Sequence, residues 1–363
     1  MLNFPQTKAE LKQLQQSLPI EFWMGIFPIN LYQGFWCPLL EPTISFQTHF
    51  QAHDTDIILA SLPKTGTTWL KSLLFAIANR NKFHDLSQHP LCTQNAHELI
   101  IQLEAKGYKT IKGTQPDFTK MPSPRLFATH IPYKSLPNSI KTSKCRIIYI
   151  CRNPFDTFVS SWHFYRQFNV TNGLKKFYHQ LSLNMGLKQF YRQLKLIMGF
   201  KNSYGKCNVS MIEEDFGRFC EGKFPYGPYE DHVLGYWKES MQNPELLLFL
   251  HYEDLKNNPI THVKKLAEFV GNPFTKDEEK GGVIDDIIKL CSLENLKEME
   301  VNKSGNFYGF FNNKTLFRKG EVGDWTNYLT PSMVKQFDIV FQEKLKGFGF
   351  SFTHSKHFCE APN

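Results

Sequence analysis

The stretch Leu62-Pro63-Lys64-Thr65-Gly66-Thr67-Thr68-Trp69 decides the fold of this chain. It follows an apolar, β-branched run at residues 57–60 and opens a helical pattern made by Leu70, Leu73, Leu74 and Ile77. A strand, a tight turn and a helix in this order make a cradle for an anion. The first N–H groups of a helix lack internal partners, and the helix dipole favours negative charge there. The stretch therefore predicts a phosphate-type site.

The side chains of the same stretch support an anion site. Lys64 adds a positive charge, and the hydroxyls of Thr65, Thr67 and Thr68 add neutral donors. The usual loop for a nucleoside triphosphate is not indicated, because no Gly stands in the six residues before Lys64 and Gly66 follows it. On this motif alone, a surface turn that enters an ordinary helix is an equally good interpretation.

Composition indicates a globular protein with an anionic ligand. The 363 residues are 41% hydrophobic and 21% charged, which suits one α/β domain spanning residues 1–363. The net charge of +8 favours an anionic partner, but no run of five basic residues occurs, so we expect no nucleic-acid binding.

The distribution of cysteines and apolar residues indicates in which cellular compartment the protein works. The 8 Cys residues are scattered without a C-x-x-C pair, so we expect neither a zinc site nor a disulfide framework, and no metal. The first eighteen residues are polar, and no stretch of about eighteen apolar residues occurs. We therefore expect no membrane association and a reducing, cytoplasmic location.

Four short apolar runs predict the strands of an α/β fold. They are Ile57–Ser61, Leu126–Thr129, Arg146–Cys151 and Leu246–Tyr252, with helical patterns between them. This alternation predicts a central, mostly parallel β-sheet flanked by helices. Each run leads into polar residues, namely Lys64, His130, Arg152 and Tyr252-Glu253. Ligands of such sheets bind beyond the carboxyl ends of the strands, so a shared site is favoured over four unrelated strand caps.

Two later motifs predict further phosphate contacts. Arg152 offers a guanidinium fork for a second phosphate, and Ser160 reaches the same anion from the following helix. A surface pair between Arg152 and Asp156 is the alternative. Near the C-terminus, Arg318-Lys319-Gly320 allows close backbone approach to another phosphate, unless it is a simple basic turn. Together the motifs suggest a ligand with phosphates at both ends.

The order and spacing of these motifs resemble those of the cytosolic sulfotransferases, and most closely those of the soluble plant members. The resemblance runs from about residue 35 to 350, is interrupted at 169–208, and rests on residues 62–69, 152–161 and 318–325. It implies a P-loop-like phosphosulfate-binding loop. It also implies transfer of a sulfuryl group from 3′-phosphoadenosine 5′-phosphosulfate (PAPS) to a hydroxyl of a small phenolic, flavonoid, steroid-like or hormone acceptor, without a metal.

The resemblance also implies roles for individual residues. His130 matches the catalytic base, and Lys64 assists as charge develops on the leaving oxygen. The 5′-phosphosulfate loop is matched by Lys64, Thr65, Gly66, Thr67, Thr68 and Trp69, with Trp69 also beside the adenine. Residues matching the 3′-phosphate contacts are Arg152, Ser160, Arg318, Lys319 and Gly320, and other nucleotide contacts match Tyr252 and Ser292.

Departures from the family pattern leave alternatives open. Leu293 and Leu316 stand where aromatic residues are usual in the family. Loss of one aromatic side chain that stacks on the adenine costs roughly 1 kcal/mol of binding free energy. A catalytically weak relative that binds PAPS or its product PAP is therefore an alternative, and a P-loop small-molecule kinase is a less favoured one. The animal-type dimer motif has no counterpart around residues 326–334, so we expect a monomer or a weak homodimer.

The acceptor is not determined by the sequence. Residues 169–208 form an atypical insert, which is either an amphipathic cover for the site or, as we favour, a surface excursion. Candidate walls of an apolar acceptor pocket, some of which are equally suited to the core, are Phe35, Trp36, Phe155, His163, Phe164, Tyr226, Tyr229 and Tyr236.

Overall fold

The computed structural model describes residues 4–25, 27–83, 85–108, 115–167, 209–307 and 311–352. The insert at 169–208 lies outside the described residues, so both interpretations of it remain predictions. The single domain spanning residues 1–363 also stays a prediction.

A five-stranded sheet forms the centre of the fold, in the order β5-β6-β4-β7-β8 with every neighbouring pair parallel. Its strands are β4 (Ile57–Ser61), β5 (Ile101–Gln102), β6 (Leu126–Thr129), β7 (Arg146–Cys151) and β8 (Leu247–His251). The predicted parallel sheet is confirmed. β4, β6 and β7 have the predicted bounds, and β8 is one residue shorter at each end than the run at 246–252. β5 was not predicted, because two residues carry no periodic signal.

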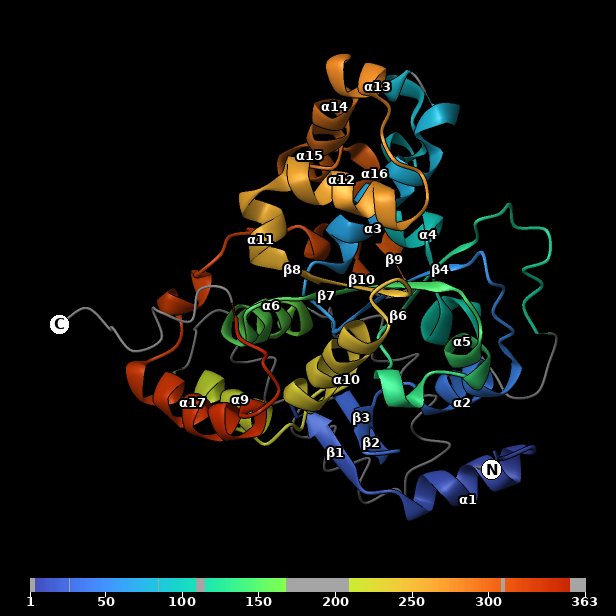
Figure 1. Cartoon of the computed structure of the whole chain (residues 1–363). Helices are drawn as coiled ribbons and strands as arrows, with labels where there is room; N and C mark the ends of the chain where they lie inside the picture. The colour runs from blue at the N-terminus through green and yellow to red at the C-terminus, as the bar shows by residue number, and fades with distance from the viewer. Residues whose placement is uncertain are drawn as a thin grey trace.

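Helices cover both faces of this sheet (Figure 1). One face carries α3 (Thr67–Asn79), α4 (Ala96–Leu99), α11 (Tyr252–Asn257), α12 (Pro259–Phe269), α13 (Lys276–Lys280), α14 (Val283–Leu290), α15 (Leu293–Glu298) and α16 (Glu300–Lys303). The other carries α2 (Leu40–His49), α5 (Asn138–Thr142), α6 (Pro154–Arg166), α9 (Val209–Cys220), α10 (Tyr229–Gln242) and α17 (Pro331–Leu345), with α1 (Lys8–Ser17) near the N-terminus. Within the described ranges, no helix combines the length and apolar character needed to cross a membrane.

Alternation along β4 divides the interior into two cores. Ile57 and Leu59 join the core under α3, α12 and α14, whereas Ile58 and Ala60 join the core that includes α6, α9 and α17. Successive side chains of a strand point to opposite faces, so a sheet covered on both sides needs apolar residues at every position. This explains why β4 reads as a continuous apolar run.

A buried ion pair aligns the strands at their amino ends. Asp56 precedes β4, and its carboxylate accepts hydrogen bonds of 2.7 Å from Nε and 2.6 Å from Nη2 of Arg125, which precedes β6. The backbone oxygen of Asp56 also accepts from the N–H of Arg146 at the start of β7, at 2.9 Å. The carboxyl ends of β4, β6 and β7 therefore open at the same edge of the sheet.

Smaller antiparallel elements that were not predicted complete the fold. They are the sheet β1 (Ile20–Trp23), β2 (Phe27–Tyr32) and β3 (Phe35–Cys37), and the pair β9 (Asn306–Phe307) and β10 (Phe311–Asn312). Backbone hydrogen bonds tie Trp36 of β3 to the loop at Tyr226 and Gly227, at 2.7 and 2.9 Å. The contacts of Trp36 join segments distant in sequence, which local patterns do not reveal, whereas the strands within each small sheet are close in sequence.

Candidate functional site

A cavity of about 630 Å³ lies beyond the carboxyl ends of the parallel strands. Its lining includes most of the predicted site residues, namely Lys64, Gly66, Thr67, Thr68, Trp69, His130, Arg152, Ser160, Tyr252, Ser292, Arg318, Lys319 and Gly320. Thr65 is not among the lining residues. The structure thus brings together side chains from segments that span more than two thirds of the chain.

The loop between β4 and α3 has an unusual backbone that fixes its shape. Lys64 has φ of 72° and Gly66 has φ of 109°, both in the left-handed region. A Cβ on Gly66 would lie 2.8 Å from Cδ2 of Tyr252, so only glycine fits here. The Thr65 hydroxyl donates to the backbone oxygens of Leu62 (2.8 Å) and Ile150 (3.1 Å). Its side chain therefore anchors the loop to β7 from inside and does not face a ligand.

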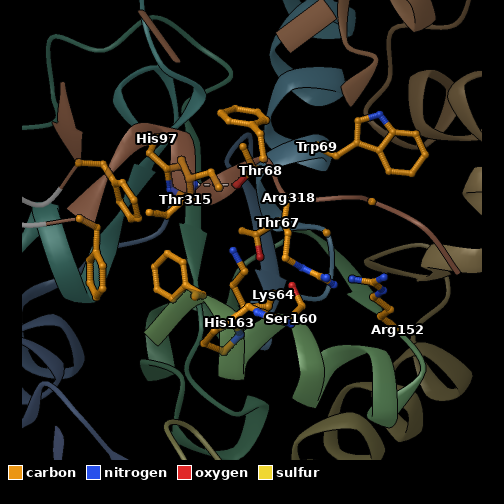
Figure 2. Close-up of a pocket in the computed structure, with 18 of the residues that line it drawn as sticks. Lys64, Thr67, Thr68, Trp69, His97, Arg152, Ser160, His163, Thr315 and Arg318 are labelled. Carbon is orange, nitrogen blue, oxygen red and sulfur yellow. Dashed lines mark hydrogen bonds between the residues drawn. The ribbon is translucent and has the colours of Figure 1, made fainter. Parts of the chain in front are cut away.

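Three cations lie along one part of the cavity. Figure 2 shows Lys64, Arg318 and Arg152 following one another there, with Ser160 and His163 below Lys64. Lys64 Nζ lies 4.2 Å from the centre of the Phe164 ring. Burial, together with the nearby charges of Arg152 and Arg318, lowers the pKa of Lys64 to about 7. A cluster of this kind is stabilised by a bound anion.

Arg152 and Arg318 are held in place by the protein. Arg152 donates from Nη2 to the backbone oxygen of Glu321 at 2.5 Å, and its guanidinium lies 4.5 Å from the Tyr252 ring centre. The pair with the Asp156 carboxylate is present at 3.8 Å, but both side chains are buried, so its expected surface location is wrong. Arg318 Nη1 lies 2.6 Å from the Asp324 carboxylate. These contacts orient both forks before a ligand binds.

Asp324 organises the C-terminal basic motif. It accepts a 2.6 Å hydrogen bond from Lys319 as well as the one from Arg318. Burial alone would raise the pKa of Asp324, but the hydrogen bonds from Lys319 and Arg318 lower it to about 2. Gly320 follows with φ of 64°, and its backbone oxygen accepts from the Tyr252 hydroxyl at 2.8 Å. The motif is thereby fixed against α11.

His130 lies on the same cavity, directly after β6. Its Nδ1 is 2.7 Å from the backbone oxygen of Ser61, and its backbone N–H donates to Glu104 Oε1 at 2.7 Å. A carbonyl only accepts, so Nδ1 carries the hydrogen and Nε2 keeps its lone pair. Burial lowers the pKa of His130 to about 3, although the Ser61 contact opposes this shift. The imidazole is therefore neutral and can accept a proton.

The residues expected near the adenine differ in how they are placed. Trp69 and Tyr252 meet edge to face with ring centres 5.5 Å apart. Ser292 caps α15, because its oxygen accepts from the Asn295 N–H at 3.1 Å. Leu293 also lines the cavity, and its Cδ2 would lie 2.7 Å from a Cβ at Gly320. A leucine thus stands beside the basic motif where an aromatic side chain was expected.

Aromatic side chains contribute to the apolar part of the cavity wall. Of the candidate walls, His163, Phe164 and Tyr226 line the cavity. The others are not among its lining residues and are buried in the core, namely Phe35, Trp36, Phe155, Tyr229 and Tyr236. Further lining residues were not predicted from the sequence, among them Phe27, Tyr165, His97, Phe307 and Phe311. None stands in a recognisable motif, and each reaches the cavity only through tertiary packing.

In the part of the chain that the structure describes, no group of three or more His, Cys, Asp or Glu side chains is placed to hold a metal ion.

Comparisons with known proteins agree with this arrangement. The family model of the sulfotransferase domain matches residues 54–349. Cytosolic sulfotransferase 15 of Arabidopsis thaliana is 41% identical over 349 residues, covering 95% of this chain and 87% of that protein. Cytosolic sulfotransferase 5 of the same plant is 41% identical over 356 residues, covering 97% and 99%.

Solved structures show the same fold. The crystal structure of an Arabidopsis thaliana protein assigned as a steroid sulphotransferase has a TM-score of 0.66 at 34% identity and covers 97% of this chain and 100% of its own. Mouse sulfotransferase SULT7A1, crystallised with PAP, has a TM-score of 0.59 at 26% identity and covers 87% and 93%. The chain belongs to the sulfotransferase family.

Proposed function

We propose that this sulfotransferase moves the sulfuryl group of PAPS to a hydroxyl of a small acceptor. The observation that carries the proposal is that the cations Lys64, Arg152 and Arg318 line the same cavity as the neutral imidazole of His130. An anionic donor and a hydroxyl that must lose a proton need these two kinds of group within one site.

The donor extends along the cationic part of the cavity. Its 5′-phosphosulfate lies at the loop of Lys64 and the first turn of α3, where Thr67 and Thr68 line the cavity. Its 3′-phosphate lies at Arg152, with Ser160, Arg318, Lys319 and Gly320 around it. Its adenine lies near Trp69 and Tyr252, with Ser292 close by. The family resemblance and the crystal structure of the mouse relative in complex with PAP support this direction.

In the transfer step, the acceptor oxygen bonds to sulfur as the bond from sulfur to the phosphate oxygen breaks. His130 takes the hydroxyl proton on Nε2, and the Ser61 oxygen stabilises the imidazolium through Nδ1–H. Lys64 stabilises the charge that develops on the departing phosphate oxygen. Sulfated acceptor and PAP leave, and His130 releases the proton to water, so atoms and charge balance without a metal and the neutral base is restored.

The acceptor is a small hydroxylated molecule with an apolar body. The Tyr226 ring centre is 5.4 Å from that of the His130 imidazole, and Phe27, Phe164 and Tyr165 also line the cavity. Phenols, flavonoids, steroid-like compounds and hormones all fit this description. We further propose that the enzyme acts in the cytoplasm, as its plant relatives are named cytosolic, and that it is a monomer or a weak homodimer.

One specific observation favours a second candidate. Leu293 replaces an aromatic surface beside the nucleotide, which suits a relative that binds PAP or PAPS but turns over slowly. A P-loop kinase is disfavoured, because its loop needs a Gly that this sequence lacks before Lys64.

Measurements of PAP binding and of sulfate transfer distinguish an active sulfotransferase from a relative that only binds the nucleotide. Thermal stability is measured with saturating PAP and with ATP and AMP as controls. A ligand at about a hundred times its dissociation constant adds roughly 2.7 kcal/mol to the native state, which raises the melting temperature by a few degrees. Transfer of labelled sulfate from PAPS to a panel of phenols, flavonols and steroids then tests catalysis. Binding without transfer supports the weak relative, and no PAP shift in a cooperatively melting protein rejects the proposed function.

A further inference from the structure

His97 joins the phosphosulfate loop to a buried lysine. Its Nε2 lies 3.0 Å from Oγ1 of Thr68, shown as a dashed line in Figure 2. On the other side of the ring, Nδ1 lies 3.3 Å from Nζ of Lys71. Thr68 and Lys71 are both on α3, one turn apart, while His97 comes from α4. Neither the sequence motifs nor the proposed mechanism assigns His97 or Lys71 a role.

Lys71 decides which nitrogen of His97 carries the hydrogen. Its ammonium is fully buried and also donates to the backbone oxygen of Ile100 at 3.0 Å. A lysine ammonium carries donors only, so charged Lys71 directs one N–H to this oxygen and another to Nδ1 of His97. Nδ1 then accepts, and the neutral ring carries its hydrogen on Nε2. Burial holds the pKa of His97 well below its usual range, with the Lys71 charge acting in the same direction.

This tautomer determines the direction of the next hydrogen bond. Nε2–H of His97 donates to Thr68 Oγ1, so that oxygen acts as the acceptor and its own O–H hydrogen points elsewhere. Among the described residues, His97 is the hydrogen-bond partner of this hydroxyl. Thr68 lines the cavity and is half-buried, so its O–H is available there. Stacking on Phe307, with ring centres 5.3 Å apart and planes 26° apart, holds the imidazole in place.

We propose that His97 is a positioning residue that turns the Thr68 hydroxyl into a dedicated donor for the sulfuryl or phosphate oxygens of the bound PAPS. The inference rests on the proposed function, which supplies the anion. In this arrangement Lys71 selects the tautomer of His97, and His97 orients the hydroxyl of Thr68. The Thr68 hydroxyl then donates a hydrogen bond to the ligand. A hydroxyl that is already oriented loses less entropy on binding than one that must reorient.

The tautomer is tested directly in the free enzyme. Protein labelled with ¹⁵N-histidine is studied by long-range ¹H–¹⁵N correlation spectra, and His97 is assigned among the 13 histidines by the signals missing from His97→Gln. We expect the pattern of a neutral ring with the hydrogen on Nε2. A hydrogen on Nδ1, or a doubly protonated ring at neutral pH, overturns the proposal whether or not the enzyme binds PAP.

Ligand affinity tests the function of the tautomer. His97→Phe keeps a ring against Phe307 but removes both nitrogens, whereas His97→Gln places an amide N–H near the position of Nε2. We expect His97→Phe to weaken PAP binding and raise the KM for PAPS about tenfold, and His97→Gln to stay within about twofold of wild type. Thr68→Val should weaken binding similarly, and His97→Phe should add nothing in that background.

Control variants distinguish the positioning role of His97 from a general loss of stability and from failure of the proposed function. His89 is buried between the rings of Phe75 and Phe83, away from the cavity lining, so His89→Phe should change the melting temperature without changing PAP affinity. Equal losses in folded His97→Phe and His97→Gln, or additive losses with Thr68→Val, overturn the inference alone. A wild type that does not bind PAP instead overturns the proposed function.

Discussion

The Nδ1 atom of His130 lies 2.7 Å from the backbone carbonyl oxygen of Ser61, the last residue of β4. Ser61 also leads into the anion loop, and its hydroxyl lies 2.8 Å from that of Thr67. The strand that presents the loop therefore also selects the tautomer of the base. Because the sheet is buried on both faces, this relationship is rigid, and it fixes the base relative to the donor site.

Removal of the base should abolish turnover but not cofactor binding. We expect His130→Ala to lower kcat by about 10²- to 10⁴-fold, because a general base contributes that much. PAP should still raise the melting temperature of the variant by the same amount as in wild type. Labelled sulfate transfer and thermal shifts measure both quantities. Retained activity in His130→Ala would remove this residue from the mechanism.

Affinity for PAP should depend on pH through Lys64. The pKa of Lys64 is lowered to about 7, so the free enzyme carries this charge below pH 7 and loses it above. A bound phosphate raises that pKa again, so binding takes up a proton at higher pH. We expect the affinity for PAP to fall from pH 7 to 9 by up to about tenfold per pH unit.

Calorimetric titrations with PAP measure this dependence above pH 7, where phosphate groups with a second pKa near 6 are already ionised. Lys64→Arg keeps its charge throughout and should show a flat profile. A flat profile in the wild type would place the titration of Lys64 outside this range.

The left-handed turn should require glycine. Gly66→Ala places a Cβ 2.8 Å from the Tyr252 ring at a φ of 109°, so we expect a loss of roughly 1–3 kcal/mol of unfolding free energy. Gly217→Ala is the matched control, because it lies within α9 with no atom within 4 Å of the added Cβ. That variant should gain up to about 1 kcal/mol. Urea unfolding compares them, and equal stability of the two would contradict the assigned strain.

An aromatic residue at position 293 should tighten nucleotide binding. Leu293 lines the cavity beside Gly320, and Leu293→Phe would supply a stacking face worth roughly 1 kcal/mol, or about a fivefold gain in PAP affinity. Pyrophosphate, which lacks the base, should bind wild type and variant equally. If Leu293→Phe tightened both ligands alike, or neither, the adenine would not lie against this residue.

Much of the fold was accessible from local patterns. β4, β6 and β7 have the predicted bounds because a strand covered on both faces must be apolar at each position, and that signal lies within four to six adjacent residues. The β1–β2–β3 sheet was missed although its antiparallel strands are neighbours in sequence, and backbone contacts of Trp36 link it to Tyr226 and Gly227, about two hundred residues away. Such a contact leaves no periodicity in either segment.

The sequence by itself determined the parallel sheet, the anion loop and the residue types at its edge, since these follow from burial and from the chemistry of Lys, Arg and His. Only the tertiary structure decided how each side chain is used. It turned Thr65 inward to Ile150, drew His97 from α4 against Thr68, and buried Phe155 in the core. The direction of a side chain depends on what packs against it, and for these residues the neighbours come from elements far apart in the chain.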